Sequence, residues 1–180
     1  MTMWLLPLLM RTAFFLLMSN LRVIGIDPGY DRCGVAIAEK DNGREVLLFS
    51  TCITTNKSDL FSERVRQVIE GITTVIETYT PAALALETLF FNQNRKTALQ
   101  VAEVRGAILH TAASRGIAIH EYSPQAVKIA ITGHGKSDKQ SVAAMIERLY
   151  HPKTAIQYDD EYDAIAIAMT ALAHTASRTP

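Results

Sequence analysis

The sequence RVIGID at Arg22–Asp27, followed directly by the turn signal Pro28-Gly29, carries a strong structural signal. A short apolar run that ends in a turn is typical of a buried strand. Arg32–Glu39 and Arg44–Thr54 also have the composition of strands, and the turn Asp41–Gly43 separates them. Three consecutive strands joined by short turns predict an antiparallel meander.

Helical and strand patterns alternate after this meander. Apolar residues recur at helical spacing up to Tyr79, in a helix that Ser58 or Asp59 is expected to cap, and Thr80-Pro81 ends that pattern. This order of elements predicts an α/β fold, with a five-stranded mixed sheet and helices on both faces. The other expected elements are strands at Ala82–Glu87 and Ile117–Tyr122, and helices at Asn94–Ser114, after Ser123-Pro124 with Ser123 as the cap, from the cap Ser137 to Tyr150 and from Asp160 to Ala176.

The composition is that of one globular domain. The chain has 180 residues, of which 48% are hydrophobic and 20% charged, so it can bury a core without disulfides. Cys33 and Cys52 form no metal-ligand spacing, which favours a reduced chain in the cytoplasm. We therefore expect a single domain over residues 18–180, with a cytoplasmic location and no membrane partner.

The beginning of the chain has a different character. It is apolar, but Pro7 and Arg11 interrupt it, and its longest apolar run is far short of the ~18 residues that a membrane span needs. No basic start and no small-residue cleavage site mark a signal peptide. Since Met18 would give the start MSNLRVIGID, we interpret residues 1–17 as an upstream translation extension outside the fold. A weak membrane anchor is the alternative.

The net charge of zero conceals a basic middle. Residues 91–140 hold seven Lys and Arg residues against three Asp and Glu residues. Such a segment can contact phosphates while acids elsewhere face solvent or metal, although a mixed solvated surface explains the charges as well.

Four carboxylates fall at the ends of expected elements. Asp27 ends the first strand and Glu87 ends the fourth, and in open α/β sheets sites gather beyond the carboxyl ends of strands. Asp160 and Asp163 open the last helix and share one of its faces. If the two strands are neighbours, all four acids converge. Taken singly, each acid also has an ordinary structural role, such as a turn residue, a helix cap or a first-turn acid.

Converging carboxylates repel one another, and metal ions relieve that repulsion. Because the set holds neither His nor Cys, it favours a hard cation, Mg²⁺ or Mn²⁺. Two ions ~4 Å apart would act on both the attacking water and the leaving 3′ oxygen of a phosphodiester. The four acids therefore predict a site with two divalent ions that hydrolyses phosphodiester bonds in DNA.

Four longer motifs lie in order along the chain: IGIDPG at Ile24–Gly29, ALALETLFFNQNRKTALQVAEVRGAIL at Ala83–Leu109, GHGKSDKQSVAAMI at Gly133–Ile146 and DEYDAIAIAMT at Asp160–Thr170. Together they resemble the RuvC family of Holliday-junction resolvases, within the ribonuclease H-like superfamily. The resemblance implies a ribonuclease H-like fold and a crossover junction endodeoxyribonuclease of DNA recombination and repair. It also implies a homodimer, whose interface would include the helix at Asn94–Ser114, because a four-way junction needs two symmetric cuts.

The resemblance also implies roles for single residues. Asp27, Glu87, Asp160 and Asp163 match the metal-binding acids of the family, and Lys139 matches a basic residue near the scissile phosphate, where it would neutralise developing charge. A solvated helix lysine is the alternative for Lys139. The expected DNA contacts are the aromatic residues Phe90 and Phe91, which would stack on bases, and the basic residues Arg95, Lys96 and Lys136, which would contact phosphates. A place in the core is the alternative for the two phenylalanines.

Departures from the family pattern concern neighbouring positions. Many members carry a His where this chain has Ala171, and the nearest histidine is His174. Asp159 adds an acid before Asp160 and leaves open which of the two binds metal. His134 makes the third motif bulkier, so the cleavage preference stays open.

Three other functions fit parts of the pattern. The DPG turn also resembles the phosphate-binding start of actin-like ATPases and sugar kinases, but ~160 residues leave no room for their second domain. A junction-binding module that does not cut, and a nuclease for other branched DNA or RNA–DNA hybrids, remain alternatives. Family members often work with a junction-binding protein and a branch-migration motor, which are possible partners here.

Overall fold

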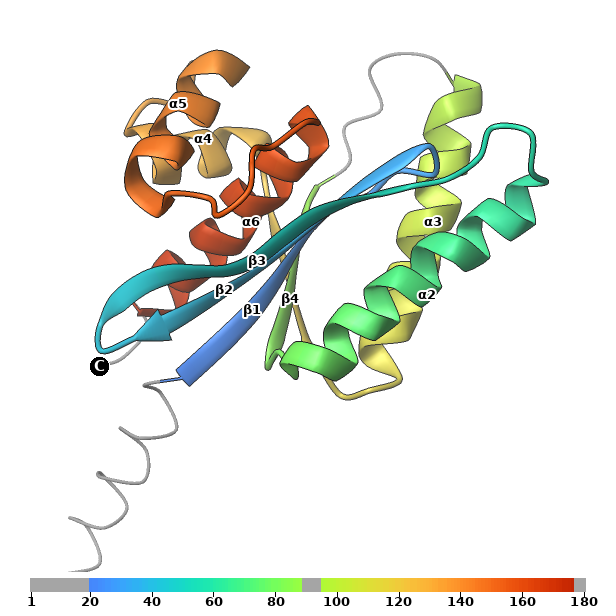
Figure 1. Cartoon of the computed structure of the whole chain (residues 1–180), viewed down its shortest axis with the longest axis horizontal. Helices are drawn as coiled ribbons and strands as arrows, with labels where there is room; N and C mark the ends of the chain where they lie inside the picture. The colour runs from blue at the N-terminus through green and yellow to red at the C-terminus, as the bar shows by residue number, and fades with distance from the viewer. Residues whose placement is uncertain (1–19, 89–94, 177–180) are drawn as a thin grey trace, which may run out of the picture.

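The computed structural model describes residues 20–88 and 95–176, and Figure 1 shows their arrangement. Within these residues one five-stranded sheet has the order β3-β2-β1-β4-β5. The strands are β1 (Asn20–Asp27), β2 (Arg32–Asp41), β3 (Arg44–Thr54), β4 (Ala83–Glu87) and β5 (Ala118–Tyr122). The helices are α2 (Phe61–Tyr79), α3 (Arg95–Ala113), α4 (Pro124–Thr132), α5 (Lys139–Tyr150) and α6 (Asp159–Ala176).

The strand pairing confirms the predicted mixed sheet. β1, β2 and β3 form an antiparallel meander, because β1 pairs antiparallel with β2, and β2 pairs antiparallel with β3. β4 pairs parallel with β1, and β5 pairs parallel with β4. The carboxyl ends of β1 and β4, two inner strands, therefore lie side by side at the same end of the sheet.

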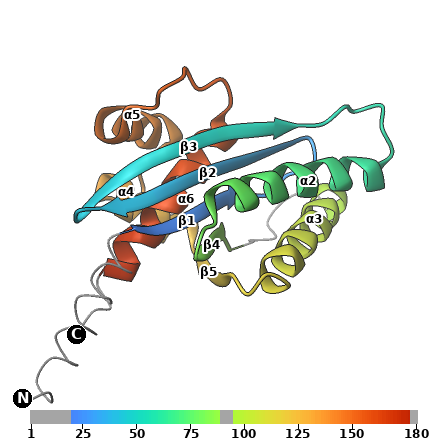
Figure 2. The same cartoon turned by 60° about the horizontal axis from the view of Figure 1, so that its bottom comes forward.

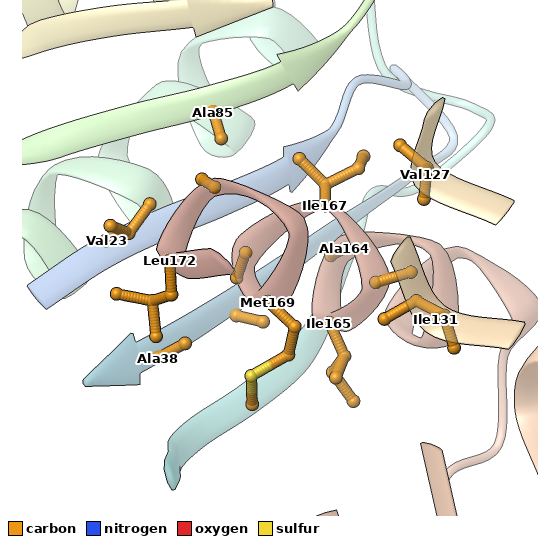
Figure 3. Close-up of a cluster of buried hydrophobic side chains, with 14 of the residues drawn as sticks. Val23, Ala38, Ala85, Val127, Ile131, Ala164, Ile165, Ile167, Met169 and Leu172 are labelled. Carbon is orange, nitrogen blue, oxygen red and sulfur yellow. The ribbon is translucent and has the colours of Figure 1, made fainter. Parts of the chain in front are cut away.

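Helices cover both faces of the sheet, as predicted. α2 and α3 lie together on one face, while α4, α5 and α6 lie on the other (Figures 1 and 2). Alternate residues of β1 follow this division: Ile24 and Ile26 belong to the core beneath α2 and α3, and Val23 belongs to the core around α6. Figure 3 shows that second core, in which Val127 and Ile131 of α4 face α6.

Helix ends agree with the sequence in part. Ser123 caps α4 as predicted, since its side chain accepts a hydrogen bond from the Ala126 amide at 3.1 Å. The expected cap of α2 at Ser58 or Asp59 is wrong, because the helix begins at Phe61 after Leu60, without a side-chain cap. The expected cap of α5 at Ser137 is also wrong by one residue, because Asp138 accepts the hydrogen bond from the Ser141 amide at 2.8 Å.

Two expectations concern membranes and the chain start. Among the described residues, none of the helices combines the length and apolarity that crossing a bilayer requires. Residues 1–17 lie outside the described residues, so their interpretation as an extension stays a prediction.

Candidate active site

The first two acids lie next to each other at the ends of parallel strands. Ile26 of β1 pairs with Leu86 of β4, and Asp27 and Glu87 directly follow these two residues. Because side chains alternate along a strand, Asp27 shares the face of Gly25, and Glu87 shares the face of Ala85. Both acids therefore lie on the face of the sheet that α6 covers.

Two glycines allow α6 to lie directly on the strands. A Cβ atom on Gly34 would stand 1.8 Å from the carbonyl oxygen of Asp160, and one on Gly25 would stand 2.4 Å from that of Ala164. Both distances are shorter than any van der Waals contact, so only glycine permits this approach. Gly34 also pairs with Asp27 across the sheet. The first turn of α6, with Asp160 and Asp163, is thereby fixed beside Asp27.

The electrostatics of the acids show that they interact. Burial, and then repulsion from Asp163, Asp160 and Glu87, raises the pKa of Asp27 to about 8. Burial and repulsion from Asp163 also raise the pKa of Glu87, and burial raises that of Asp160. The structure thus brings together all four acids that the sequence singled out.

The residues at this site fit a divalent cation. Asp160 Oδ2 is buried and forms no hydrogen bond; its contact is the ion pair with Arg32 Nε at 2.9 Å. A donor set made only of carboxylates, one of them with a buried oxygen that forms no hydrogen bond, suits a hard cation. As the side chains stand, however, no three His, Cys, Asp or Glu residues of the described ranges are arranged to hold an ion. Metal binding therefore requires side-chain rearrangement.

Lys139 lies beside the acids, where the sequence prediction put it. It is the first residue of α5, and its Nζ atom donates to Asp163 Oδ2 at 2.9 Å and to Asp159 Oδ2 at 3.1 Å. Burial opposes the ammonium charge, but the bonds to Asp163 and Asp159 outweigh it and hold the pKa of Lys139 above its usual value. A permanent positive charge therefore stands at the edge of the site.

Sequence reasoning missed Arg32 and Lys128. The Arg32 Nε atom lies 2.9 Å from Asp160 Oδ2, in an ion pair that lacks hydrogen-bond geometry. Its position two residues before Gly34 in β2 puts it on the α6 face, a signal that the strand alternation contained. Lys128 of α4 lies near enough to oppose the rise in the pKa of Glu87.

Two buried arginines hold the backbone next to the strand-end acids. Arg105 of α3 donates to the carbonyl oxygen of Glu87 at 3.0 Å and forms an ion pair with Glu121. Arg64 of α2 donates to the carbonyl oxygen of Tyr30 at 3.2 Å, in the turn that follows Asp27. Charged donors to backbone carbonyls are among the stronger hydrogen bonds of a protein. The arginines therefore fix the chain at both acids.

The predicted DNA contacts are largely outside the described structure. Phe90 and Phe91 lie outside the described residues, and of Arg95 and Lys96 only the backbone, at the start of α3, is described. Lys136 is exposed in the loop before α5.

The rings of His174 and Tyr122 are in tilted contact, with centroids 5.1 Å apart, and Tyr122 pairs with Glu87 across the sheet. Ala171, where many family members carry a histidine, is buried.

Comparison with known proteins agrees with this geometry. The family model described as crossover junction endodeoxyribonuclease RuvC matches residues 23–171. The RuvC proteins of Leifsonia xyli and Heliobacterium modesticaldum are 39% and 37% identical; the matches cover 83% and 82% of this chain, and 73% and 91% of those proteins.

Solved structures show the same relationship. Thermus thermophilus RuvC in complex with a Holliday junction substrate is 31% identical, with a TM-score of 0.79 over 87% of this chain and 96% of that one. The yeast mitochondrial Holliday junction resolvase Ydc2, at 17% identity and a TM-score of 0.62 over 87% of this chain and 81% of its own, shares the fold. The chain belongs to the RuvC family of crossover junction endodeoxyribonucleases.

Proposed function

We propose that this chain cuts Holliday junctions by hydrolysing one phosphodiester bond in each of two opposed strands. The observation that carries the proposal is the convergence of Asp160, Asp163 and Glu87 on Asp27, whose pKa is raised to about 8 by burial first and then by these carboxylates. The family membership and the 31% identity to a junction-bound RuvC support the substrate. Water adds to phosphorus and the 3′ oxygen leaves, so the products carry a 5′ phosphate and a 3′ hydroxyl.

The proposed metal ligands are Asp27, Glu87, Asp160 and Asp163. When bound, divalent cations, which we take to be two Mg²⁺ ions with Mn²⁺ as a substitute, supply Lewis acidity at the attacking and leaving oxygens. The carboxylates hold the cations on the face that α6 covers. The ammonium group of Lys139, 2.9 Å from Asp163, neutralises charge that develops on the phosphoryl group.

The DNA-binding surface is proposed to extend from this site over Phe90, Phe91, Arg95, Lys96 and Lys136. The aromatic residues would stack on bases near the crossover, and the basic residues would contact phosphates without reading sequence. Substitution of the basic residues would weaken binding equally for all DNA sequences and reduce the dependence of binding on salt.

A homodimer is part of the proposal, since paired cuts require two sites. We propose α3, on which Leu99 is 64% exposed, as part of the interface because the family resemblance implies it. A junction-binding protein and a branch-migration motor are the proposed partners, and the cytoplasm, where chromosomal DNA lies in bacteria, is the proposed location.

The test uses the chain with labelled four-way junction, linear duplex and RNA–DNA hybrid, each with Mg²⁺ or EDTA. Paired, Mg²⁺-dependent nicks in the junction alone, lost in Glu87→Gln, are expected. Junction binding without cleavage would refute the nuclease activity, and preferential cleavage of the hybrid would refute the proposed substrate. Mass photometry of the same samples reports whether the chain is a dimer.

A further inference from the structure

Asp159, the acid that precedes the proposed metal ligand Asp160, contacts two cations at once. Its Oδ2 atom accepts from Lys139 Nζ at 3.1 Å, and its Oδ1 atom lies 3.3 Å from Arg32 Nη2. The same two cations also contact the proposed metal ligands: Lys139 is 2.9 Å from Asp163, and Arg32 is 2.9 Å from Asp160. Asp159 thus offers each cation a second carboxylate next to the first.

These pairs compete with a divalent cation. A carboxylate oxygen that accepts a hydrogen bond from an ammonium group or faces a guanidinium attracts a metal ion less strongly. Asp160 and Asp163 are both paired in this way, and no three acids of the described ranges stand ready to hold an ion. A cation that binds Asp160 Oδ2 and Asp163 Oδ2 would therefore displace Arg32 from the first and Lys139 from the second.

Arg32 has two further contacts that it would retain if it left Asp160. Its guanidinium carbon lies 5.3 Å from the centroid of the Tyr158 ring, and Tyr158 is next to Asp159 in the chain. Stacking on an aromatic ring and pairing with a carboxylate are compatible for the planar guanidinium. Arg32 can therefore leave Asp160 and keep both Asp159 and Tyr158.

We propose that Asp159 is a positioning residue that holds Arg32 and Lys139 beside the metal site, so that Asp160 and Asp163 become available to divalent cations. In the metal-free chain, Arg32 pairs with Asp160 and so competes with cations for this carboxylate. This inference rests on the proposed metal site. It assigns Asp159 a function distinct from metal binding.

The experiment measures the dissociation constant of Mn²⁺ by calorimetry and by electron paramagnetic resonance of free Mn²⁺. The full chain is compared with Arg32→Gln, Asp159→Asn and the double variant. Arg44→Gln and Asp41→Asn are matched charge controls, because both residues are exposed and lie at the other end of the hairpin that carries Arg32. Circular dichroism verifies that each variant is folded.

We expect Arg32→Gln to bind Mn²⁺ about two- to fivefold more tightly and Asp159→Asn about two- to fivefold more weakly, the range that partly exposed ion pairs give. In the double variant the effect of the Asp159 substitution should shrink, because Arg32 is no longer there to be held. If Arg32 and Asp159 acted independently, the fold-changes in Mn²⁺ affinity of the two single variants would instead multiply in the double variant.

Unchanged affinity in either single variant, or effects that multiply in the double variant, would overturn the inference while leaving the metal site intact. Absence of Mn²⁺ binding in the unsubstituted chain, with Glu87→Gln giving the same result, would refute the metal site itself and the inference with it. The two failures are therefore distinguishable.

Discussion

Substitution of Asp27 by Asn tests the electrostatic basis of the site without DNA. The carboxyl group of Asp27 has a pKa of about 8 in the folded chain, against 3.8 for the ordinary group. The folded state therefore binds one more proton than the unfolded state between these values. The stabilisation that this proton gives is complete below about pH 4 and is lost as the pH rises to about 8.

The magnitude follows from linkage. Because the folded state binds one extra proton, the free energy of unfolding falls by about 1.4 kcal/mol for each unit by which the pH rises. Between pH 5 and pH 7 this amounts to at most about 3 kcal/mol. Partial hydration of the carboxyl group reduces this value. The amide that replaces the carboxyl group in Asp27→Asn cannot ionise. In EDTA the stability of this variant relative to the unsubstituted chain should therefore rise by up to that amount over the same interval.

Urea denaturation in EDTA at pH 5, 6, 7 and 8 measures the difference directly, and the exposed Asp41→Asn serves as the control. Because both chains share every other titrating group, only the Asp27 contribution remains in the difference. Parallel stability profiles for Asp27→Asn and the unsubstituted chain would refute the reasoning, because Asp27 would then already be ionised at pH 5 and would not be crowded by other carboxylates.

Three further substitutions test the packing and the chemistry. Gly34→Ala should destabilise the chain by about 2–4 kcal/mol in urea denaturation, because its Cβ would overlap the Asp160 carbonyl; Gly106→Ala, in open space on α3, should be neutral or stabilising. Lys139→Met should lower kcat for junction cleavage about 100-fold without weakening Mn²⁺ binding, and an unchanged kcat would remove Lys139 from the chemistry. Arg105→Met should lower kcat more than stability alone explains, and rescue by Arg105→Lys would identify the charged contacts with the Glu87 carbonyl and with Glu121 as the cause.

Local sequence patterns predicted the elements of this fold. The acids at the ends of these elements predicted the candidate site. The apolar run before Pro28 gave β1, and the alternation of strands and helices gave the mixed sheet. The neighbouring positions of Asp27 and Glu87 depended on β1 and β4 being paired, a relation between distant segments that the sequence left conditional. The misplaced cap at Ser58 or Asp59 has a local reason: Asp59 accepts a hydrogen bond from Gln67 at 2.9 Å instead of capping α2.

Interactions across the sheet were beyond such patterns. The close approach of α6 to Gly34 was not predicted, because it joins segments far apart in the sequence. The ion pair of Arg32 was not predicted, because nothing in its neighbourhood along the chain indicates a pair with Asp160, 128 positions later. Long-range ion pairs depend on tertiary geometry, and a single sequence contains no record of them.

The crowding of the acids couples metal binding to proton release. Near neutral pH Asp27 is mostly protonated in the metal-free chain, since its pKa is about 8, and a metal ligand must give up its proton. Mn²⁺ binding at pH 7 should therefore release close to one proton, and the apparent affinity should rise about tenfold per pH unit up to about pH 8 and then level off. Calorimetry in two buffers of different ionisation enthalpy counts the released protons. A count near zero at pH 7, with affinity independent of pH, would mean that Asp27 is already ionised or does not bind the ion.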